Sequence, residues 1–225
     1  MSERGAVLRI DDVTLKFGGI VAIKSVTFEA QPSELLALVG PNGAGKTALL
    51  NCISGIYRPT SGNIFLDGAS IVGEPLHRKV KLGVGRAFQH AELFPELERL
   101  LKRRAGLLSG GEQKMLALAS GLASDPKLLL VDELSLGLAP LVVERLLTSL
   151  DEARSRGVAV VLVEQQLQKA LAIADRAYVL RRGQVELQGT TAELRERVDE
   201  LRSQYINRSG VSPASDIDAP GREQR

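Results

Sequence analysis

A chain of 225 residues is long enough for one large domain or two small ones. Its 44% hydrophobic and 25% charged residues are typical of a soluble globular protein. The formal net charge of +2 is too small to indicate a nucleic-acid or membrane-surface binder, and the single cysteine, Cys52, excludes an internal disulfide.

No apolar run approaches the roughly 20 residues that a membrane-spanning helix needs. The N-terminal sequence MSERGAVLRIDD contains no apolar signal region. The sequence therefore predicts a cytosolic protein, unless a partner holds it at a membrane. Cys52 lies in an apolar helical stretch and is expected to be a core thiol in a reducing compartment.

The N-terminal part of the chain is predicted to be rich in strands. Apolar patterns predict strands at Val7–Phe17, Val26–Ala30, Leu35–Val39, Asn63–Leu66 and Val84–Phe88, with a helix at Lys46–Ser54. The turn signal Asp67-Gly68 ends the fourth of these strands. These early strands suggest an antiparallel flank.

Strands and helices alternate in the rest of the chain. The pattern predicts, in order, helix Glu112–Ala123, strand Leu128–Val131, helix Leu141–Ser155, strand Val158–Val163, a helix near Leu167–Ala174, strands Tyr178–Leu180 and Val185–Leu187 around the hairpin signal Arg182-Gly183, and a last helix from Thr191 to about Tyr205. This alternation predicts an α/β core with a mainly parallel sheet. We expect one domain over residues 1–208 and a disordered tail over 209–225, which has no periodicity.

A glycine-rich loop joins the third strand to the first helix. Gly40, Pro41, Asn42, Gly43, Ala44, Gly45, Lys46 and Thr47 match G-x-x-x-x-G-K-[ST] at every fixed position. Such glycines let amide N–H groups turn toward phosphate oxygens, and the helix start adds its positive end. Lys46 is expected to reach the β- and γ-phosphates, and Thr47 to bind Mg²⁺. A glycine-rich turn without a ligand is the alternative, and the agreement of strand, loop, Lys-Thr pair and helix argues against it.

The strand that ends in Asp132-Glu133 is the second half expected of a nucleotide site. Its carboxyl end is where an α/β sheet binds ligands, so Asp132 can hold the Mg²⁺ shell. Glu133 could polarise an attacking water as general base. Taken alone, an apolar run ending in Asp-Glu is as often a strand that meets a solvated loop. The phosphate loop upstream favours the functional interpretation.

The tract Leu108-Ser-Gly-Gly-Glu-Gln113 makes the pattern specific. With it, the chain resembles the ATP-binding subunit of ABC transporters from about Leu8 to Leu201. Ser109, Gly110 and Gly111 open a helix and form a second anion-binding helix start. The resemblance implies that this tract contacts the γ-phosphate held by another subunit, so that two chains enclose two ATP molecules. A polar glycine turn that caps a helix is the alternative.

Two further positions take their roles from the resemblance. Phe17, before Gly18-Gly19, matches the aromatic residue that stacks on adenine, and a core phenylalanine is the alternative. Gln89 matches the glutamine that senses Mg²⁺ and the γ-phosphate, and an ordinary polar residue at a strand end is the alternative. The stretches KFGGIVAIKSVTFEA, LLNCISGIYRPTSG, SLGLAP and VLVEQQ resemble the ATPases that serve branched-chain amino-acid importers.

The chain departs from the family at three places. Leu134 replaces the usual proline, which alters loop rigidity more than chemistry. Gln165 stands where most members carry a switch histidine; glutamine can donate a hydrogen bond but cannot carry a proton charge, and "VEQ" is frequent in the subfamily. Third, only 18 residues, 90–107, separate Gln89 from Leu108, where the family has a helical subdomain that docks on the membrane protein. Residues from about 90 to 125 would form its remnant, shortened by an internal deletion.

The leading interpretation is an ATP-hydrolysing subunit of an importer for branched-chain or related amino acids. It would work with transmembrane permease subunits, as a homodimer or with a paralogous ATPase, at the inner face of the cell membrane and without nucleic acid. Two alternatives stay open. The chain could be an ATP-binding remnant that cannot couple to a permease, or a soluble ABC ATPase outside transport, although it lacks the insertions usual in that class.

Overall fold

The computed structural model describes residues 5–86, 103–123, 125–132 and 140–197. Its strands are β1 (Leu8–Phe17), β2 (Ile20–Ala30), β3 (Leu35–Val39), β4 (Ser61–Leu66), β5 (Ala69–Ser70), β6 (Val84–Arg86), β7 (Leu128–Asp132), β8 (Ala159–Glu164), β9 (Arg176–Arg181) and β10 (Gln184–Thr190). Its helices are α1 (Lys46–Ser54), α2 (Leu76–Lys81), α4 (Gly110–Ala123), α5 (Pro140–Ser155) and α6 (Leu167–Ile173), with a 3-10 turn η2 (Ala105–Leu107) and a helical segment over 191–197.

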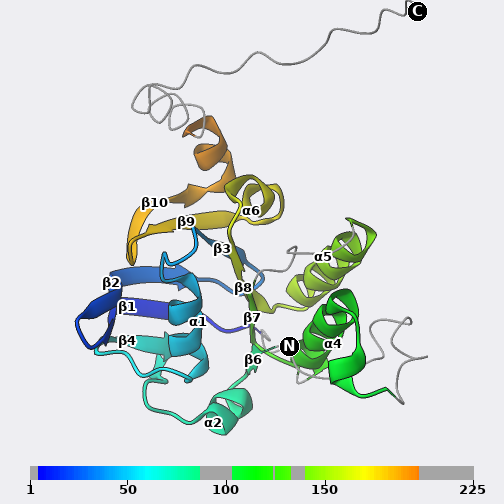
Figure 1. Cartoon of the computed structure of the whole chain (residues 1–225), viewed down its shortest axis with the longest axis horizontal. Coiled ribbons are helices and arrows are strands. Elements are labelled where there is room, and N and C mark those ends of the chain that lie inside the picture. Colours follow the sequence, from blue (N-terminus) through cyan, green and yellow to red (C-terminus); the bar gives the residue numbers. More distant parts are fainter. Residues whose placement is uncertain (1–4, 87–102, 124, 133–139, 198–225) are drawn as a thin grey trace, which may run out of the picture.

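The strands form two sheets (Figure 1). The first has the order β2-β1-β4-β5 and is antiparallel throughout. The second has the order β10-β9-β3-β8-β7-β6; its strands are parallel except β10, which returns from β9 as a hairpin. The mainly parallel α/β core and the N-terminal antiparallel flank predicted from the sequence are thus confirmed.

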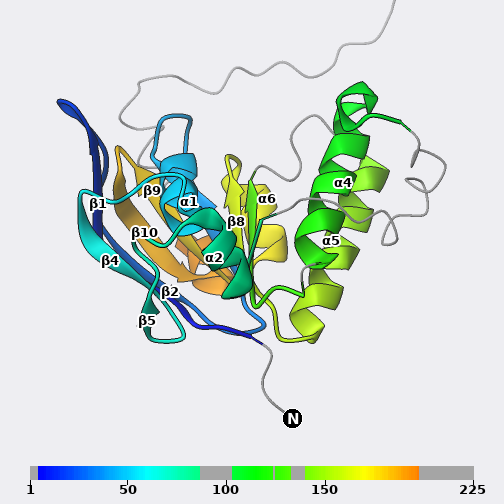
Figure 2. The same ribbon diagram turned by 90° about the horizontal axis from the view of Figure 1, so that it is seen from below.

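The parallel sheet carries a separate apolar core on each face. On one face its side chains pack with α1 and the antiparallel sheet, and on the other with α4, α5 and α6. Figure 2 shows this layering, with the two green helices α4 and α5 on the side of the sheet away from α1. Because both faces are covered, β3 reads Leu-Leu-Ala-Leu-Val and is buried along its whole length.

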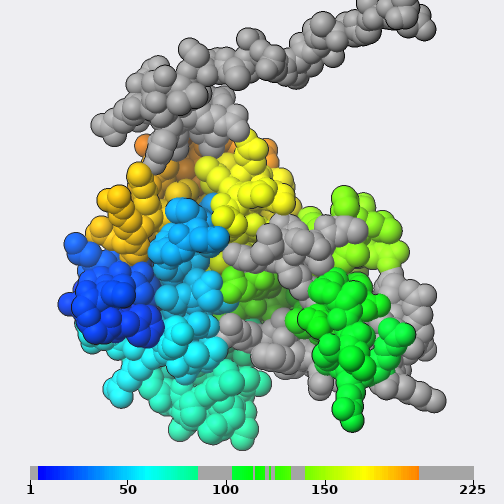
Figure 3. All heavy atoms as spheres, in the orientation of Figure 1, coloured from blue at the N-terminus to red at the C-terminus, as the bar shows by residue number. Residues whose placement is uncertain are grey.

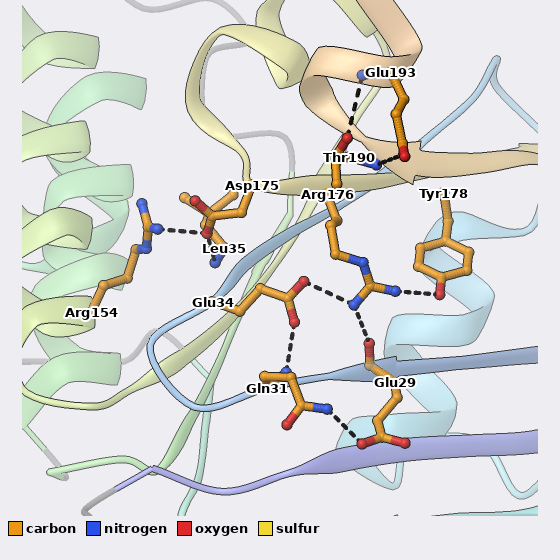
Figure 4. Close-up of polar contacts among 10 residues, drawn as sticks. All are labelled: Glu29, Gln31, Glu34, Leu35, Arg154, Asp175, Arg176, Tyr178, Thr190 and Glu193. Atoms are coloured by element: carbon orange, nitrogen blue, oxygen red, sulfur yellow. Dashed lines mark hydrogen bonds and ion pairs between the residues drawn. The ribbon is translucent and has the colours of Figure 1, made fainter.

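A polar network fixes the amino end of β3 (Figure 4). Asp175 accepts the Leu35 N–H at 2.8 Å and an Arg154 guanidinium N–H at 2.5 Å. Arg176 donates to the buried Glu34 carboxylate at 3.0 Å and to the Tyr178 hydroxyl at 2.8 Å. The central strand is therefore held at its start by β9 and α5, and the glycine loop follows its other end.

Several predicted bounds are wrong by a few residues, and short elements were missed. The second strand was expected from Val26, but β2 begins at Ile20, and α2, β5 and η2 were not predicted. The last helix begins as expected, with Thr190 and Glu193 exchanging hydrogen bonds that lower the pKa of Glu193. Its predicted continuation to Tyr205, residues 90–102 of the proposed helical remnant and the 209–225 tail lie outside the described residues.

Within the described parts of the chain, no helix has both the length and the apolarity that crossing a bilayer demands.

The buried Cys52 thiol should make the folded state sensitive to alkali. Burial raises its pKa from 9.0 to about 11, against the opposing influence of the Lys79 ammonium. The folded protein therefore keeps a proton that the unfolded chain releases above pH 9, and its free energy of unfolding falls as the pH rises toward 11. The loss attributable to this thiol is about 2–3 kcal/mol.

Urea unfolding of the protein and of Cys52→Ala, measured below pH 9 and near pH 11, tests this expectation. Lys79 acts in the opposite direction, because burial lowers its pKa from 10.5, and it is present in both proteins. We expect the difference in stability between the two proteins to change with pH in favour of the alanine variant. A constant difference across this range would contradict a buried, titrating thiol.

Candidate functional site

The glycine loop lies between the carboxyl end of β3 and the first turn of α1. Gly43 and Gly45 have φ values of 78° and 101°, in the left-handed region that favours glycine. A Cβ atom on Gly45 would lie 2.5 Å from the carbonyl oxygen of Ala22, so any side chain there is also excluded by close packing. The sequence motif is therefore required by the backbone conformation, and α1 starts at Lys46 as predicted.

The Lys46 side chain lies inside this loop. It is only 4% exposed, and its ammonium donates hydrogen bonds to the carbonyl oxygens of Gly40 at 2.7 Å and Pro41 at 3.0 Å. Thr47 follows in the first turn of α1 and is exposed, as are Pro41, Asn42 and Gly43. A cation ringed by backbone at a helix start, with a hydroxyl beside it, is suited to a polyphosphate and its Mg²⁺.

A distant hairpin braces the glycine loop, a contact that the sequence did not reveal. Gly183, in the turn between β9 and β10, donates its N–H to the Ala44 carbonyl at 3.0 Å and accepts from the Lys24 N–H at 2.8 Å. A Cβ on Gly183, which has a φ of 79°, would lie 2.8 Å from the Ala22 carbonyl oxygen. Arg182-Gly183 was predicted as a hairpin turn; it is also a support for the loop.

Three strand ends meet at the edge of the sheet where this loop lies. The parallel register pairs Val39 of β3 with Glu164 of β8, and Val163 of β8 with Asp132 of β7. Asp132 is exposed at this edge, and Gln165, also exposed, follows β8 directly. Two predicted site residues from separate parts of the chain thus lie at this edge: Gln165 follows β8, which pairs with the loop-bearing β3, and Asp132 ends β7, one strand further away.

Glu164 is a carboxylate at this edge that the sequence analysis did not single out. It is only 5% exposed, and its Oε2 accepts the N–H of Gln165 at 3.0 Å. It therefore fixes the backbone of the residue expected at the switch position. In the sequence, Glu164 is only a charged residue at the end of an apolar run. Such a run does not reveal whether the side chain at its end is buried.

The tract at Ser109–Gly111 opens a helix, as predicted, with α4 beginning at Gly110. Ser109 and Glu112 form a reciprocal cap: the Ser109 N–H donates to Glu112 Oε2 at 2.7 Å, and the Glu112 N–H donates to Ser109 Oγ at 3.3 Å. Gln113 donates its side-chain amide to the Leu108 carbonyl at 3.1 Å. The glutamate and glutamine of LSGGEQ thus order the turn that presents the serine and the two glycines.

Phe17 is at the end of β1 and is 47% exposed, which excludes the alternative of a core phenylalanine. Its ring meets that of Tyr57 in a T-shaped pair, with centroids 5.1 Å apart and planes at 77°. An exposed aromatic ring held by a second ring can stack on a planar ligand. Tyr57 was not identified from the sequence.

Gln89, Glu133 and Leu134 lie outside the described residues. Their expected roles therefore stay predictions, and so does the proposed deletion beyond Gln89.

Comparison with known families matches two segments of the chain. A family model described as "ABC transporter" matches residues 23–102, and one described as an AAA domain (Type IV TA system) matches residues 96–163. The chain is also 37% identical to the high-affinity branched-chain amino acid transport ATP-binding protein BraG of Pseudomonas aeruginosa, an alignment that covers 84% of this chain and 94% of BraG.

The alignment with BraG has more positions than it has residues of this chain. It runs over 220 positions but includes 84% of 225 residues, or about 189, so about 31 positions of BraG have no counterpart here. A deficit of this size is consistent with a missing internal segment.

Solved structures show the same fold. The ADP conformation of MJ1267, an ATP-binding cassette of an ABC transporter, superposes with a TM-score of 0.78 at 22% identity and covers 90% of this chain and 98% of that one. The dimeric post-hydrolysis state of the ATP-binding cassette MJ0796, bound to ADP and Pi, superposes with a TM-score of 0.67 at 25% identity, covering 82% and 98%.

Proposed function

This chain belongs to the family of ABC transporter ATP-binding proteins, and from that premise we propose that it binds and hydrolyses ATP to power an importer. The observation that carries the proposal is the buried Lys46 ammonium within the glycine loop, at the same sheet edge as Asp132. That arrangement suits a nucleoside triphosphate better than any neutral ligand, because it concentrates positive charge and backbone donors at one helix start.

The roles proposed for the residues are those predicted from the sequence, and Gln89 and Glu133 lie outside the described residues. The loop amides and Lys46 bind the phosphate chain, and Phe17 stacks on the adenine. Thr47, Asp132 and Gln89 would hold Mg²⁺, which neutralises charge on the phosphates when bound. Glu133 takes a proton from the attacking water, and Gln165 donates a hydrogen bond near the γ-phosphate.

Hydrolysis in this proposal needs two chains. Ser109, Gly110 and Gly111 of one chain would meet the γ-phosphate held by the loop of the other. The reciprocal cap between Ser109 and Glu112 supports this, since it keeps the turn ordered before a partner arrives. The partner is a second copy or a paralogous ATPase. The dimer recorded for MJ0796 is a related precedent.

The membrane partner would be a pair of permease subunits that hold the ATPase peripherally at the inner face of the cell membrane. The solute would be a branched-chain or related amino acid, because this chain is 37% identical to BraG and carries the stretches that resemble the branched-chain subfamily. No nucleic acid takes part in this scheme.

A second candidate function is an ATP-binding remnant that cannot drive a permease. It is favoured by the 18 residues between Gln89 and Leu108 and by the deficit of about 31 positions against BraG. The missing segment would be the helical subdomain that docks on the permease. The glycine loop and Asp132, in contrast, lie at the end of the parallel sheet and outside that subdomain.

Mg²⁺-dependent ATP hydrolysis by the purified chain, measured across protein concentrations, separates the two functions. For a sandwich dimer we expect the activity per chain to rise with concentration and to level off when dimers dominate. Folded protein that binds ATP but shows no such rise, and no hydrolysis above background, would refute the catalytic proposal and support the remnant.

A further inference from the structure

The largest fully buried side chain among the described residues is a lysine, Lys79 of α2. It is 1% exposed, although a buried ammonium is unfavourable by several kcal/mol unless its donors are satisfied. Burial accordingly lowers the pKa of Lys79, with Cys52 and Glu74 acting in the opposite direction. None of the predicted roles of the nucleotide site uses this residue.

The Lys79 ammonium caps the far end of the phosphate-loop helix. It donates to the carbonyl oxygens of Ile53 at 2.9 Å and Cys52 at 3.3 Å, both in the last turn of α1. A cation at a helix C-terminus satisfies carbonyl groups that have no partner in the helix and interacts favourably with its dipole. Gly55 leaves room for the lysine stem, since a Cβ there would lie 3.1 Å from Lys79 Cε.

The helix that carries Lys79 is joined in turn to the parallel sheet. After α2 the chain reaches Gly83, whose carbonyl accepts the N–H groups of Lys127 at 2.9 Å and Leu128 at 3.1 Å. Leu128 is the first residue of β7, and β7 ends at Asp132. Figure 3 shows the segment containing α2, in teal, directly against the cyan segment that follows α1.

Lys79 therefore connects the two elements that carry predicted Mg²⁺ ligands, helix α1 and strand β7. Thr47 belongs to α1, and Asp132 belongs to β7. Their relative placement depends on how α1 is oriented against the sheet, and the Lys79 hydrogen bonds fix α1 at the end opposite to Thr47.

We propose that Lys79 is a positioning residue for Mg²⁺: by capping α1 it holds Thr47 in register with Asp132. This inference rests on the proposed function, because it concerns the same site. It predicts a specific defect, in Mg²⁺-dependent binding alone, because Lys46 begins the same helix but its ammonium is also held in the glycine loop by the Gly40 and Pro41 carbonyls.

The test compares Lys79→Met with Lys81→Met, which removes an exposed lysine from the same helix. Methionine keeps the buried stem and removes the charge, so folding is expected to survive. ATP affinity is measured by calorimetry with Mg²⁺ and with EDTA. For Lys79→Met we expect binding about tenfold weaker with Mg²⁺, as for other residues that orient metal ligands, and unchanged in EDTA. Lys81→Met should match the parent, and Lys79→Arg should recover part of the loss.

Equal ATP affinities for Lys79→Met and the parent in Mg²⁺, with only a lower melting temperature, would overturn the proposal and leave Lys79 a stabilising residue. An equal weakening with and without Mg²⁺ would overturn it too. A parent protein that binds no ATP even with Mg²⁺ would instead refute the proposed function, and this outcome is distinct from a failure of the present inference.

Hydrogen exchange on the unaltered protein gives a second measurement that does not depend on a variant. If Lys79 joins α2 to α1, addition of Mg²⁺ and ATP should slow exchange in residues 76–82 more than in the β4–β5 hairpin over 61–70. Equal changes in the two segments would contradict the coupling.

Discussion

Replacing Lys46 with methionine should weaken ATP binding by about two to three orders of magnitude. This is the expected effect of losing about two charge-assisted hydrogen bonds. The ammonium is enclosed by the loop and 4% exposed, so no surface lysine can take its place. Methionine retains the volume of the stem. The loop should therefore persist while its central positive charge is lost.

Calorimetric titration with ATP measures this effect, and circular dichroism verifies the fold. Lys24→Met is the matched control, because Lys24 is an exposed lysine on β2 whose backbone N–H contacts the same hairpin turn. Its affinity should stay within a factor of about two of the parent. Tight ATP binding by Lys46→Met would contradict the assignment of the loop as the phosphate site.

The Glu133→Gln variant should lose ATP hydrolysis by about 10² to 10³-fold while ATP binding is retained. Glutamine has the shape of glutamate but cannot take the proton of the attacking water. ATP would then persist in the site, so a dimer that forms only with ATP should accumulate. Phosphate release measures the first effect, and gel filtration with and without ATP measures the second.

Glu144→Gln serves as the control for this variant, since it removes an exposed carboxylate on α5. It should hydrolyse ATP at the parental rate. Unchanged hydrolysis in Glu133→Gln would mean that another group activates the water, and the catalytic role of this residue would have to be withdrawn.

Local patterns predicted the elements around the nucleotide site well. The bounds of β3 and α1 match the expected Leu35–Val39 and Lys46–Ser54, because an uninterrupted apolar run, three glycines and a helical apolar spacing all lie within 20 residues. The strand β2 was predicted too short, since its first residues, Ile20 and Val21, are exposed and its pairing with β1 contains register shifts. Irregular pairing removes the alternation on which a prediction depends.

The parts of the site that could not be predicted are contacts across long sequence separations. Gly183 braces the loop through backbone atoms, which leave no residue pattern. Lys79 and Glu164 are charged residues in buried places, and composition favours the surface for both. The burial of Lys79 is explained only by the packing of α2 against α1. The burial of Glu164 is explained only by the place of β8 between β3 and β7.

The central position of β3 also determines when this protein can become active during its synthesis. Its neighbours in the sheet are β8 and β9, and the Leu35 N–H bonds a carboxylate 140 residues further along the chain. At the usual speed of translation, about 5–20 residues per second, this apolar strand waits about 7–28 s for its partners. The glycine loop waits for a similar time, until Gly183 has left the ribosome. ATP therefore cannot guide the early folding of its own site, and the nascent chain exposes an unpaired hydrophobic strand that a chaperone would shield.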